Sequence, residues 1–513
     1  MKNRIKASIY FLTTAVCVLA LPAVAQMTSV GIDCSQIRAL NLLMQENLRA
    51  GAALVECGIV LGGRAIGGSD NGEVPAPPNI LVSNRSCTGP TTCTKSENMV
   101  WGNGQTVVVN FNDNLGDSSN YSGTSYSKDG GATFTQILPP PFITGHSSNF
   151  GDPIVVYNQK LGLWFAGDLV TGCGGFGIGL WTSPDGITWT TGGCAFNGVN
   201  NDRPSMWVDN DPTSAGYGRM YVSFNNFVLS GALEVSYSDD GNTWNTVQLS
   251  SGFIRDVQMS GAQLSPTANR AALRAYNSVF VASMDEGGGG PATRQNVMWR
   301  SDNGGASWTQ IIMGPRFNPV GDSTCGYFEQ VNPIWRHMGW GEPAVGPNHV
   351  VHYVFAGAGT NSDTGDIYYT RSTDNGTTWS TPTKLNTDPD EQYHTQWMPS
   401  LSVNAAGKVT ASWYDRRSVS SACNAVSDPG CNYERYARQS PDNGVTWGPD
   451  FAVSSGIINQ PDQQNSHQVS CYAGDYDYAT AQGSNAYVTW TDGRRNVGGV
   501  QVQDVNLAVV PEQ

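Results

Sequence analysis

The sequence has little charge and no excess of basic residues. Asp, Glu, Lys and Arg make up 14% of its 513 residues, and 42 acidic residues stand against 28 basic ones. The net charge of −14 argues against nucleic acid and anionic membranes as partners, because both repel an acidic surface. The sequence also has no Cys-x-x-Cys pair, the spacing typical of structural zinc sites. We expect no nucleic-acid partner and no cofactor, and the sequence leaves open whether any residue binds a metal.

Long apolar runs are absent too, except near the N-terminus. Three basic residues within the first six positions precede an apolar run at 9–21, and small residues at 23–25 follow it. This pattern predicts a signal peptide over residues 1–25, cleaved near Ala25, and hence a secreted or periplasmic protein. A membrane anchor is the alternative, but the run is short for a spanning helix, so we expect no membrane span.

The cysteines fit an exported protein. Loss of Cys17 with the signal peptide leaves ten of the eleven cysteines, an even number that predicts disulfides. Spacing favours four pairs and leaves a fifth, long-range one: Cys34–Cys57, Cys87–Cys93, Cys173–Cys194, Cys423–Cys431 and Cys325–Cys471.

One short motif, Ser-x-Asp-x-Gly-x-Thr/Ser-Trp/Phe, occurs six times with small variations, and we call each copy a repeat turn. The copies begin at Ser127, Ser183, Ser238, Ser301, Ser372 and Ser440. Asp and Gly adopt the backbone conformations of tight turns, so each copy predicts a hairpin. We expect the aromatic residue that follows to be buried between neighbouring sheets. The starting serines are 55 to 71 residues apart, and a repeat of this length predicts a propeller or a similar array.

The repeat turns resemble the Asp-box (BNR) repeats of sialidase-like β-propellers, and the resemblance covers roughly residues 79–510. It implies an all-β propeller. Proteins with such repeats include sialidases, xyloglucan-cleaving glycosidases, sorting-receptor ectodomains and photosystem assembly factors. The activity must therefore be argued from the site rather than from the fold.

The chain divides into an N-terminal helical segment with a linker (26–78) and a propeller (79–513). Apolar spacing predicts a helix over about 34–49 and a second short one to about 60, followed by a Gly- and Pro-rich linker. Six units of four short strands carry the repeat turns. A seventh unit lacks the turn and offers strands at 476–479, 486–490 and 500–505, with 80–83 as its outer strand. Seven blades are therefore favoured, and six, as in sialidases, is the alternative.

Strand order predicts where chemistry can occur. If each repeat turn joins the third strand to the outermost one, the segments that enter the innermost strands converge on the opposite face. Paired carboxylates and arginines there can perform acid/base chemistry on a sugar. The candidate catalytic residues are Asp152, Asp202, Arg203, Arg255, Asp256, Glu342, Asp475 and Tyr476. The candidate substrate-binding residues are Trp335, Arg336, Trp340, Arg416 and Arg494. For any single residue, an ion pair that ties two blades together is the simpler interpretation.

The resemblance also implies a mechanism. Sialidases bind the substrate carboxylate with three arginines and use a Tyr–Glu nucleophile pair with an Asp acid/base. Their aromatic-Arg-Ile/Leu-Pro motif is absent here, and Asp202-Arg203-Pro204 only places Arg and Pro side by side. Tyr476 is the best candidate nucleophile.

The leading hypothesis is a monomeric, secreted, carbohydrate-directed propeller, specifically an exo-α-sialidase-like glycoside hydrolase. The alternative is a non-catalytic binding or scaffold propeller. A xyloglucan endo-hydrolase is a third option, but such enzymes usually have two propellers, for which this chain is too short.

Overall fold

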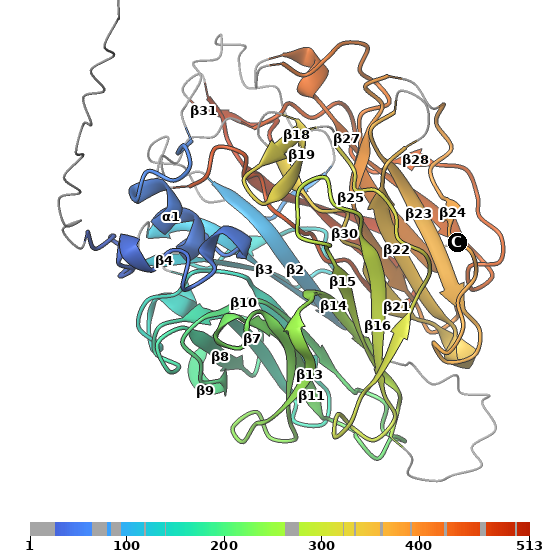
Figure 1. Cartoon of the computed structure of the whole chain (residues 1–513). Coiled ribbons are helices and arrows are strands. Elements are labelled where there is room, and N and C mark those ends of the chain that lie inside the picture. The colour runs from blue at the N-terminus through green and yellow to red at the C-terminus, as the bar shows by residue number, and fades with distance from the viewer. Residues whose placement is uncertain are drawn as a thin grey trace, which may run out of the picture.

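The computed structural model describes most of the chain after the predicted signal peptide. The described residues are 26–63, 79–83, 94–116, 119–138, 140–261, 276–321, 323–332, 335–359, 363–389, 392–424, 428–461, 468–497 and 500–512. The signal peptide and the predicted pair Cys87–Cys93 lie outside them. Within them the fold is almost entirely antiparallel β-sheet with one α-helix, which confirms the predicted all-β class (Figure 1).

Six four-stranded sheets follow one another in chain order. The first sheet contains β2 (Lys95–Asn103), β3 (Thr106–Gly116), β4 (Asn120–Ser127) and β5 (Thr135–Gln136). The second contains β6 (Ile154–Asn158), β7 (Leu163–Val170), β8 (Gly177–Ser183) and β9 (Thr190–Phe196). The third contains β10 (Asn201–Val208), β11 (Met220–Asn226), β12 (Ala232–Ser238) and β13 (Asn245–Phe253). The fourth sheet contains β14 (Arg255–Gly261), β15 (Val279–Asp285), β16 (Gln295–Ser301) and β17 (Thr309–Ile312). The fifth contains β21 (Glu342–Val345), β22 (Val351–Gly357), β23 (Asp366–Ser372) and β24 (Thr383–Lys384). The sixth contains β25 (Gln396–Val403), β26 (Val409–Asp415), β27 (Glu434–Ser440) and β28 (Phe451–Ala452).

The seventh four-stranded sheet joins the two ends of the propeller. It consists of β29 (Thr480–Gln482), β30 (Asn485–Asp492), β33 (Asp504–Pro511) and, outermost, β1 (Ile80–Leu81). Ile80 pairs with Leu507, so the outer strand comes from the N-terminal side as expected. The strand predicted at 476–479 is wrong, because this stretch instead runs alongside β2, where the Tyr478 amide donates to the Asn98 carbonyl at 2.9 Å.

The innermost strands form a closed cycle. Each contacts the innermost strand of the following sheet, in the order β2, β6, β10, β14, β21, β25 and β29, and β29 contacts β2. Strands next to the centre, such as β22 and β26, are buried along their whole length because a neighbouring sheet covers each face. The cycle favours the seven-bladed prediction over the six-bladed one.

Shorter elements lie outside the seven four-stranded sheets. The described part of the long connection between β17 and β21 contains β18 (Ser323–Cys325), β19 (Phe328–Asn332) and β20 (Trp335–His337). The remaining elements are the hairpin β31 (Asn496–Val497) with β32 (Val500–Gln501) and the 3-10 turns η4 (Pro141–Ile143), η5 (Phe227–Leu229), η6 (Pro347–His349) and η7 (Pro429–Cys431). Four predicted disulfides are confirmed: Cys34–Cys57, Cys173–Cys194, Cys325–Cys471 and Cys423–Cys431.

All six repeat turns connect the third strand of a sheet to the fourth. In one of them Asp374 accepts from the Thr378 amide at 2.8 Å and from the Thr378 and Ser372 hydroxyls, while the Gly376 amide donates to Ser372 Oγ at 2.8 Å. The aromatic residue is buried in the first turn, at Phe134, and the five tryptophans of the other turns pack against the apolar cores of the sheets but are only partly buried. Trp379 Nε1 donates to the carbonyl of Gly376 in its own turn at 3.2 Å, and this bond holds one edge of the ring near the surface.

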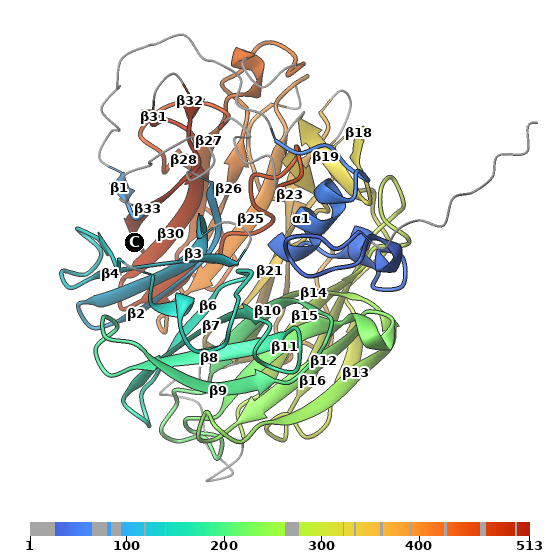
Figure 2. The same cartoon turned by 90° about the vertical axis from the view of Figure 1, so that its left-hand side faces the viewer.

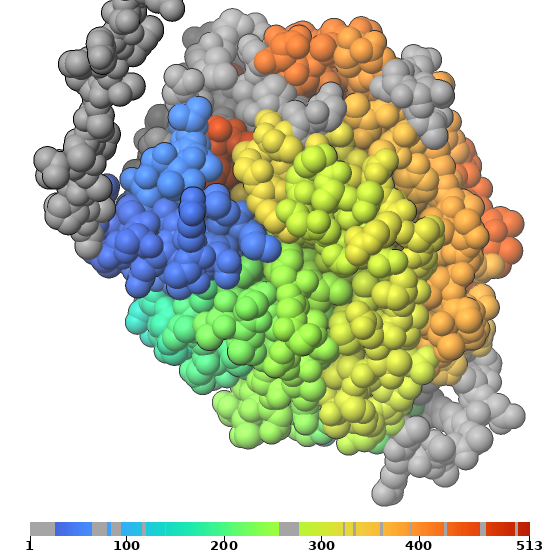
Figure 3. Space-filling view, in the orientation of Figure 1, coloured from blue at the N-terminus to red at the C-terminus, as the bar shows by residue number. Residues whose placement is uncertain are grey.

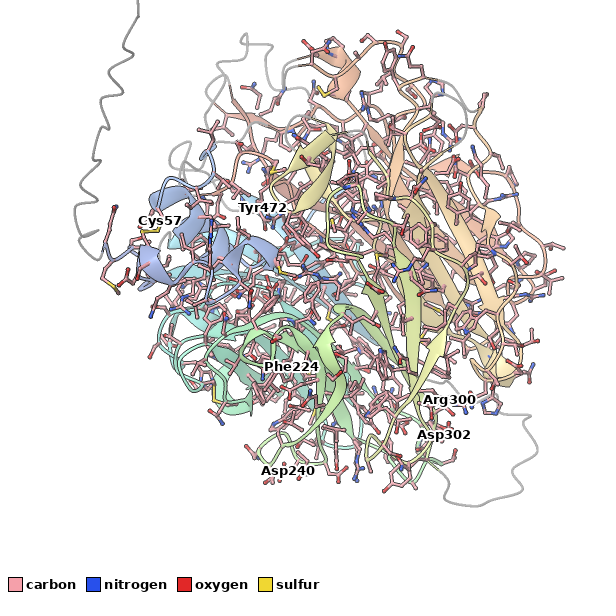
Figure 4. The ribbon with its side chains drawn as sticks, in the orientation of Figure 1. Cys57, Phe224, Asp240, Arg300, Asp302 and Tyr472 are labelled. Atoms are coloured by element: carbon pink, nitrogen blue, oxygen red, sulfur yellow. A yellow bond between two sulfur atoms is a disulfide. The ribbon has the colours of Figure 1, made fainter. Side chains whose placement is uncertain are left out.

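The N-terminal segment differs from the prediction. Residues 34–49 do not form one helix, but two 3-10 turns, η1 (Cys34–Gln36) and η2 (Leu42–Met44), before α1 (Leu48–Glu56). Figures 1 and 2 show α1 on the same side of the ring as the β18–β19 hairpin. Asp240 and Asp302, from two repeat turns, lie at the far side of the molecule from Cys57 and Tyr472 (Figure 4). The segment therefore covers the face opposite to the repeat turns.

Candidate functional site

The candidate site lies where the chain enters the innermost strands, on the face that the N-terminal segment covers. We call it the ring mouth and define it by Glu97, Asp152, Asp202, Arg203, Arg255, Arg336, Glu342, Asp475 and Tyr476. All of these side chains are buried.

Three ring-mouth residues have an unusual backbone. Glu97, Asp152 and Arg203 adopt positive φ angles of 45°, 58° and 51°, and β-bulges interrupt the strand register beside Glu97 and Arg203. Each such conformation costs about 1–3 kcal/mol in a residue other than Gly, and such strain is concentrated at functional sites. The repeated strain marks the ring mouth as a candidate site.

At the centre of the ring mouth lies Glu46, a residue of the N-terminal segment. Its carboxylate is 2.7 Å from Arg203 Nε and 3.9 Å from Arg255 Nη1. A third arginine, Arg336, donates from Nη2 to the Glu46 carbonyl oxygen at 3.0 Å. Three guanidinium groups from different parts of the ring therefore meet at this one residue.

The arginines are held in place by other acids and by aromatic rings. Arg255 Nη1 is 3.2 Å from Asp202 Oδ2, and Arg336 Nε is 3.0 Å from Asp475 Oδ1. The Arg203 guanidinium lies 4.9 Å from the ring centroid of Trp340 and 5.0 Å from that of Tyr476. These contacts fix the guanidinium groups before any external ligand arrives, which lowers the entropic cost of binding.

Several buried acids at the ring mouth have raised pKa values, which favours their protonated forms. Burial raises the pKa of Glu46 well above its ordinary value, although Arg203 and Arg255 counteract the shift. Burial also raises the pKa of Glu97 and of Asp152 well above the ordinary values, and the neighbouring carboxylates add to both shifts. Burial raises the pKa of Glu342 to about 8. Carboxyl groups of this kind can donate protons near neutral pH.

Tyr476 is placed beside two of these acids. Burial raises the pKa of its phenol well above the ordinary value, with further contributions from Asp152 and Glu97. The buried Tyr476 hydroxyl and the Asp152 Oδ1 atom are among the buried polar atoms that have no hydrogen-bond partner within the described residues. An unpaired buried polar group is costly, so these two atoms are candidates for contact with a ligand.

Several predicted residues lie elsewhere. Trp335 is fully buried among Trp397, Tyr414 and Tyr433, which leaves no face for a sugar. Arg416 donates to the Val331 and Gly430 carbonyls, and Arg494 pairs with Asp492 at 2.6 Å. The side chain of Asp256 lies outside the described residues.

Trp340 and Glu342 lie beside the arginines but have structural partners. Trp340 is buried, and its Nε1 donates to Glu286 Oε1 at 2.8 Å. Glu342 accepts from the Leu401 amide at 3.0 Å and so ties β21 to β25.

The sequence reasoning missed Glu46 and did not single out Glu97. Glu97 begins the inner part of β2 at the position that Asp152 and Arg203 occupy in the next two sheets, so aligning the units could have found it. Glu46 belongs to the polar triplet 45–47, which interrupts the apolar spacing of the segment. That interruption is the one feature of the sequence that could have pointed to Glu46.

A possible metal site can also be assessed. His146, Cys173 and Cys194 have potential ligand atoms within 4.8 Å of one another. Both sulfur atoms belong to one disulfide and are not available as thiolate ligands. In the part of the chain that the structure describes, no helix has the length and apolar character needed to cross a membrane.

Comparison with known proteins finds similar structures but no family. No protein-family model and no curated protein match the chain. Similar solved structures include a protein of unknown function from Dyadobacter fermentans (13% identity, TM-score 0.41, covering 86% of this chain and 100% of that one). They also include an ulvan lyase from a polysaccharide lyase family (9%, 0.47, 88% and 96%) and a mutant α-L-arabinofuranosidase from Fusarium graminearum (11%, 0.38, 85% and 98%). Likeness at this level assigns no activity to the chain.

Proposed function

We propose that the ring mouth binds a carboxylate-bearing sugar and that the protein is a secreted exo-α-sialidase-like glycoside hydrolase. The observation that carries this proposal is the contact of Arg203 and Arg255 with the Glu46 carboxylate, completed by Arg336 on the backbone of the same residue. Guanidinium groups recognise carboxylates through charge-assisted hydrogen bonds. An arginine cluster of this kind suits the carboxylate of an acidic sugar.

The neighbouring groups suit glycoside cleavage. Tyr476 is the proposed nucleophile, as in glycosidases that use a tyrosine. Its phenol needs a base, and Glu97 is the proposed one. Asp152, whose pKa is raised by burial, is the proposed general acid for the leaving group. Entry of water in an open form would lower the pKa of Glu97 toward the ionised state that a base requires.

The test is hydrolysis of fluorogenic glycosides by the purified protein. Because Glu46 fills the ring mouth, the wild type and Glu46→Ala are both assayed with an α-N-acetylneuraminide and with neutral glycosides. We expect turnover of the acidic substrate, and a loss of at least 100-fold in kcat for Tyr476→Phe and Asp152→Asn. Tyr157→Phe, at a half-buried tyrosine of β6, is the control. No turnover of any glycoside by either folded protein would contradict the hydrolase proposal.

A specific observation favours the non-catalytic alternative. The acids of the ring mouth already tie neighbouring sheets together, since Asp152 Oδ2 accepts from the Arg203 amide at 3.0 Å and Glu97 Oε1 from the Asp475 amide at 2.9 Å. In a scaffold protein, Arg203→Ala would change stability alone. Calorimetry with sialylated and neutral oligosaccharides separates the two, because a scaffold gives no heat with any of them.

A further inference from the structure

We propose that the N-terminal segment is a tethered inhibitor of the ring mouth, in which the Glu46 side chain occupies the place of the ligand's carboxylate. This inference rests on the proposed function and adds to it a closed state of the site. In the space-filling view, the segment (blue) lies against both the green and the yellow parts of the ring (Figure 3).

The segment contacts the ring mouth through the ion pairs of Glu46 and through hydrogen bonds of the adjoining backbone, and its apolar side chains pack into one core with the ring. Besides the arginine contacts of Glu46, the amides of Glu46 and Asn47 donate to the two carboxylate oxygens of Asp202 at 2.9 and 3.1 Å. Asn47 Nδ2 donates to Asp202 Oδ1 at 2.9 Å, and Arg255 Nη2 donates to the Met44 carbonyl. Both the carboxylate and the adjoining backbone of the segment are therefore recognised.

The backbone of the segment is shaped to deliver Glu46. Asn41 adopts a left-handed conformation (φ 53°) just before η2, and Gln45 is extended just after it. Asn47 then caps α1 by accepting from the Ala50 amide at 2.9 Å. Glu46 thus lies in a short extended stretch between two helical elements, where its side chain and both of its peptide groups can reach the ring.

The segment is attached to the ring mouth without a covalent bond of its own. Its two cysteines, Cys34 and Cys57, bond to each other, so the disulfide holds the segment together and does not tie it to the ring. A pocket of about 250 Å³ opens beside Glu46, between the segment and the loops at residues 175–176 and 199–200, while apolar side chains of α1 pack against the ring. Displacement of Glu46 therefore concerns the short stretch between η2 and α1, because the buried face of α1 belongs to the same core as the ring.

Removal of the Glu46 carboxylate should admit an external one. The experiment titrates N-acetylneuraminic acid into the wild type and into Glu46→Ala by calorimetry, with the methyl ester of the same sugar as a ligand without a carboxylate. The matched control is Glu56→Gln, because the Glu56 carboxylate accepts from Ser29 within the same segment. We expect at least tenfold tighter binding to Glu46→Ala than to the wild type or the control, and no gain for the ester.

A second measurement covers the case in which Glu46→Ala does not fold. Hydrogen exchange of the wild type is followed with and without excess N-acetylneuraminic acid, and faster exchange of amides 42–50 in its presence is expected. If the wild type binds the acid as tightly as the variant, with unchanged exchange, the inhibitor proposal is overturned and the proposed function stands. If neither folded protein binds any acidic sugar, the proposed function fails, and the inhibitor proposal fails with it.

Discussion

Replacing Arg203 by Ala should destabilise the protein strongly and in a pH-dependent way. The side chain is buried, 2.7 Å from Glu46, and stacked between Trp340 and Tyr476. Removing one partner of a buried ion pair leaves the other charge uncompensated and costs about 3–5 kcal/mol. We expect a loss of this size in the free energy of unfolding at pH 8.

The loss should be smaller at pH 5 because Glu46 can then take up a proton. Its pKa in the folded protein is raised above the ordinary value of 4.5, so its contribution to stability is complete below that pH and is lost as the pH rises through the raised pKa. Arg203 lowers the pKa of Glu46, so removing Arg203 should raise that pKa further. Between the ordinary pKa and this higher pKa, each pH unit then changes the free energy of unfolding by up to about 1.4 kcal/mol.

The assay is urea unfolding at pH 5 and pH 8, followed by tryptophan fluorescence. The control is Arg316→Ala, because the side chains of Arg316 and Asp285 are 42% and 40% exposed, and exposed pairs contribute about 0–1 kcal/mol. An Arg203→Ala loss within 1 kcal/mol of the control, or an equal loss at both pH values, would refute the reasoning.

Three further predictions concern the repeat turns and the disulfides. Asp374→Ala should cost about 1 kcal/mol and Asp374→Asn less, because Asn303 accepts the equivalent bonds in the fourth turn; urea unfolding checks both. Trp379→Ala should lower the free energy of unfolding by about 1–3 kcal/mol in thermal melts, below the 3–5 expected of a fully buried ring, and no shift would mean that the ring contributes nothing. Peptide mapping without reduction should recover the four disulfides of the structure together with Cys87–Cys93, and free thiols at these positions would count against the framework.

Much of the fold can be predicted from the sequence because its information is local and repeated. In each repeat turn the bonded residues lie within a few positions of one another, as Ser372, Asp374 and Gly376 do. The turn can therefore be recognised from the sequence wherever it occurs. The N-terminal segment carries no such signal, and its apolar spacing misleads because Gln45, Glu46 and Asn47 bond to the ring instead of continuing a helix.

The site can be predicted only in part, for a related reason. Topology alone brings Asp152, Arg203 and Asp475 to one face, since all three lie where the chain enters an innermost strand. The amide of Glu46 meets Asp202 across 156 positions of the chain, and no local pattern encodes such a contact. Arg494 carries the same charge as Arg203, but it pairs with Asp492 two residues away and is satisfied locally.

The composition of the ring mouth bears on whether the site is functional. If the N-terminal segment had a purely structural role, its contacts at the ring mouth would be expected to be apolar, because replacing buried ion pairs by well-packed apolar side chains is often neutral or stabilising. The ring mouth instead combines three arginines, several buried acids and three strained backbone positions. Each of these features costs stability, and their concentration in one place is typical of sites shaped for binding or chemistry. This composition supports the proposal that Glu46 occupies a site whose charge suits another carboxylate.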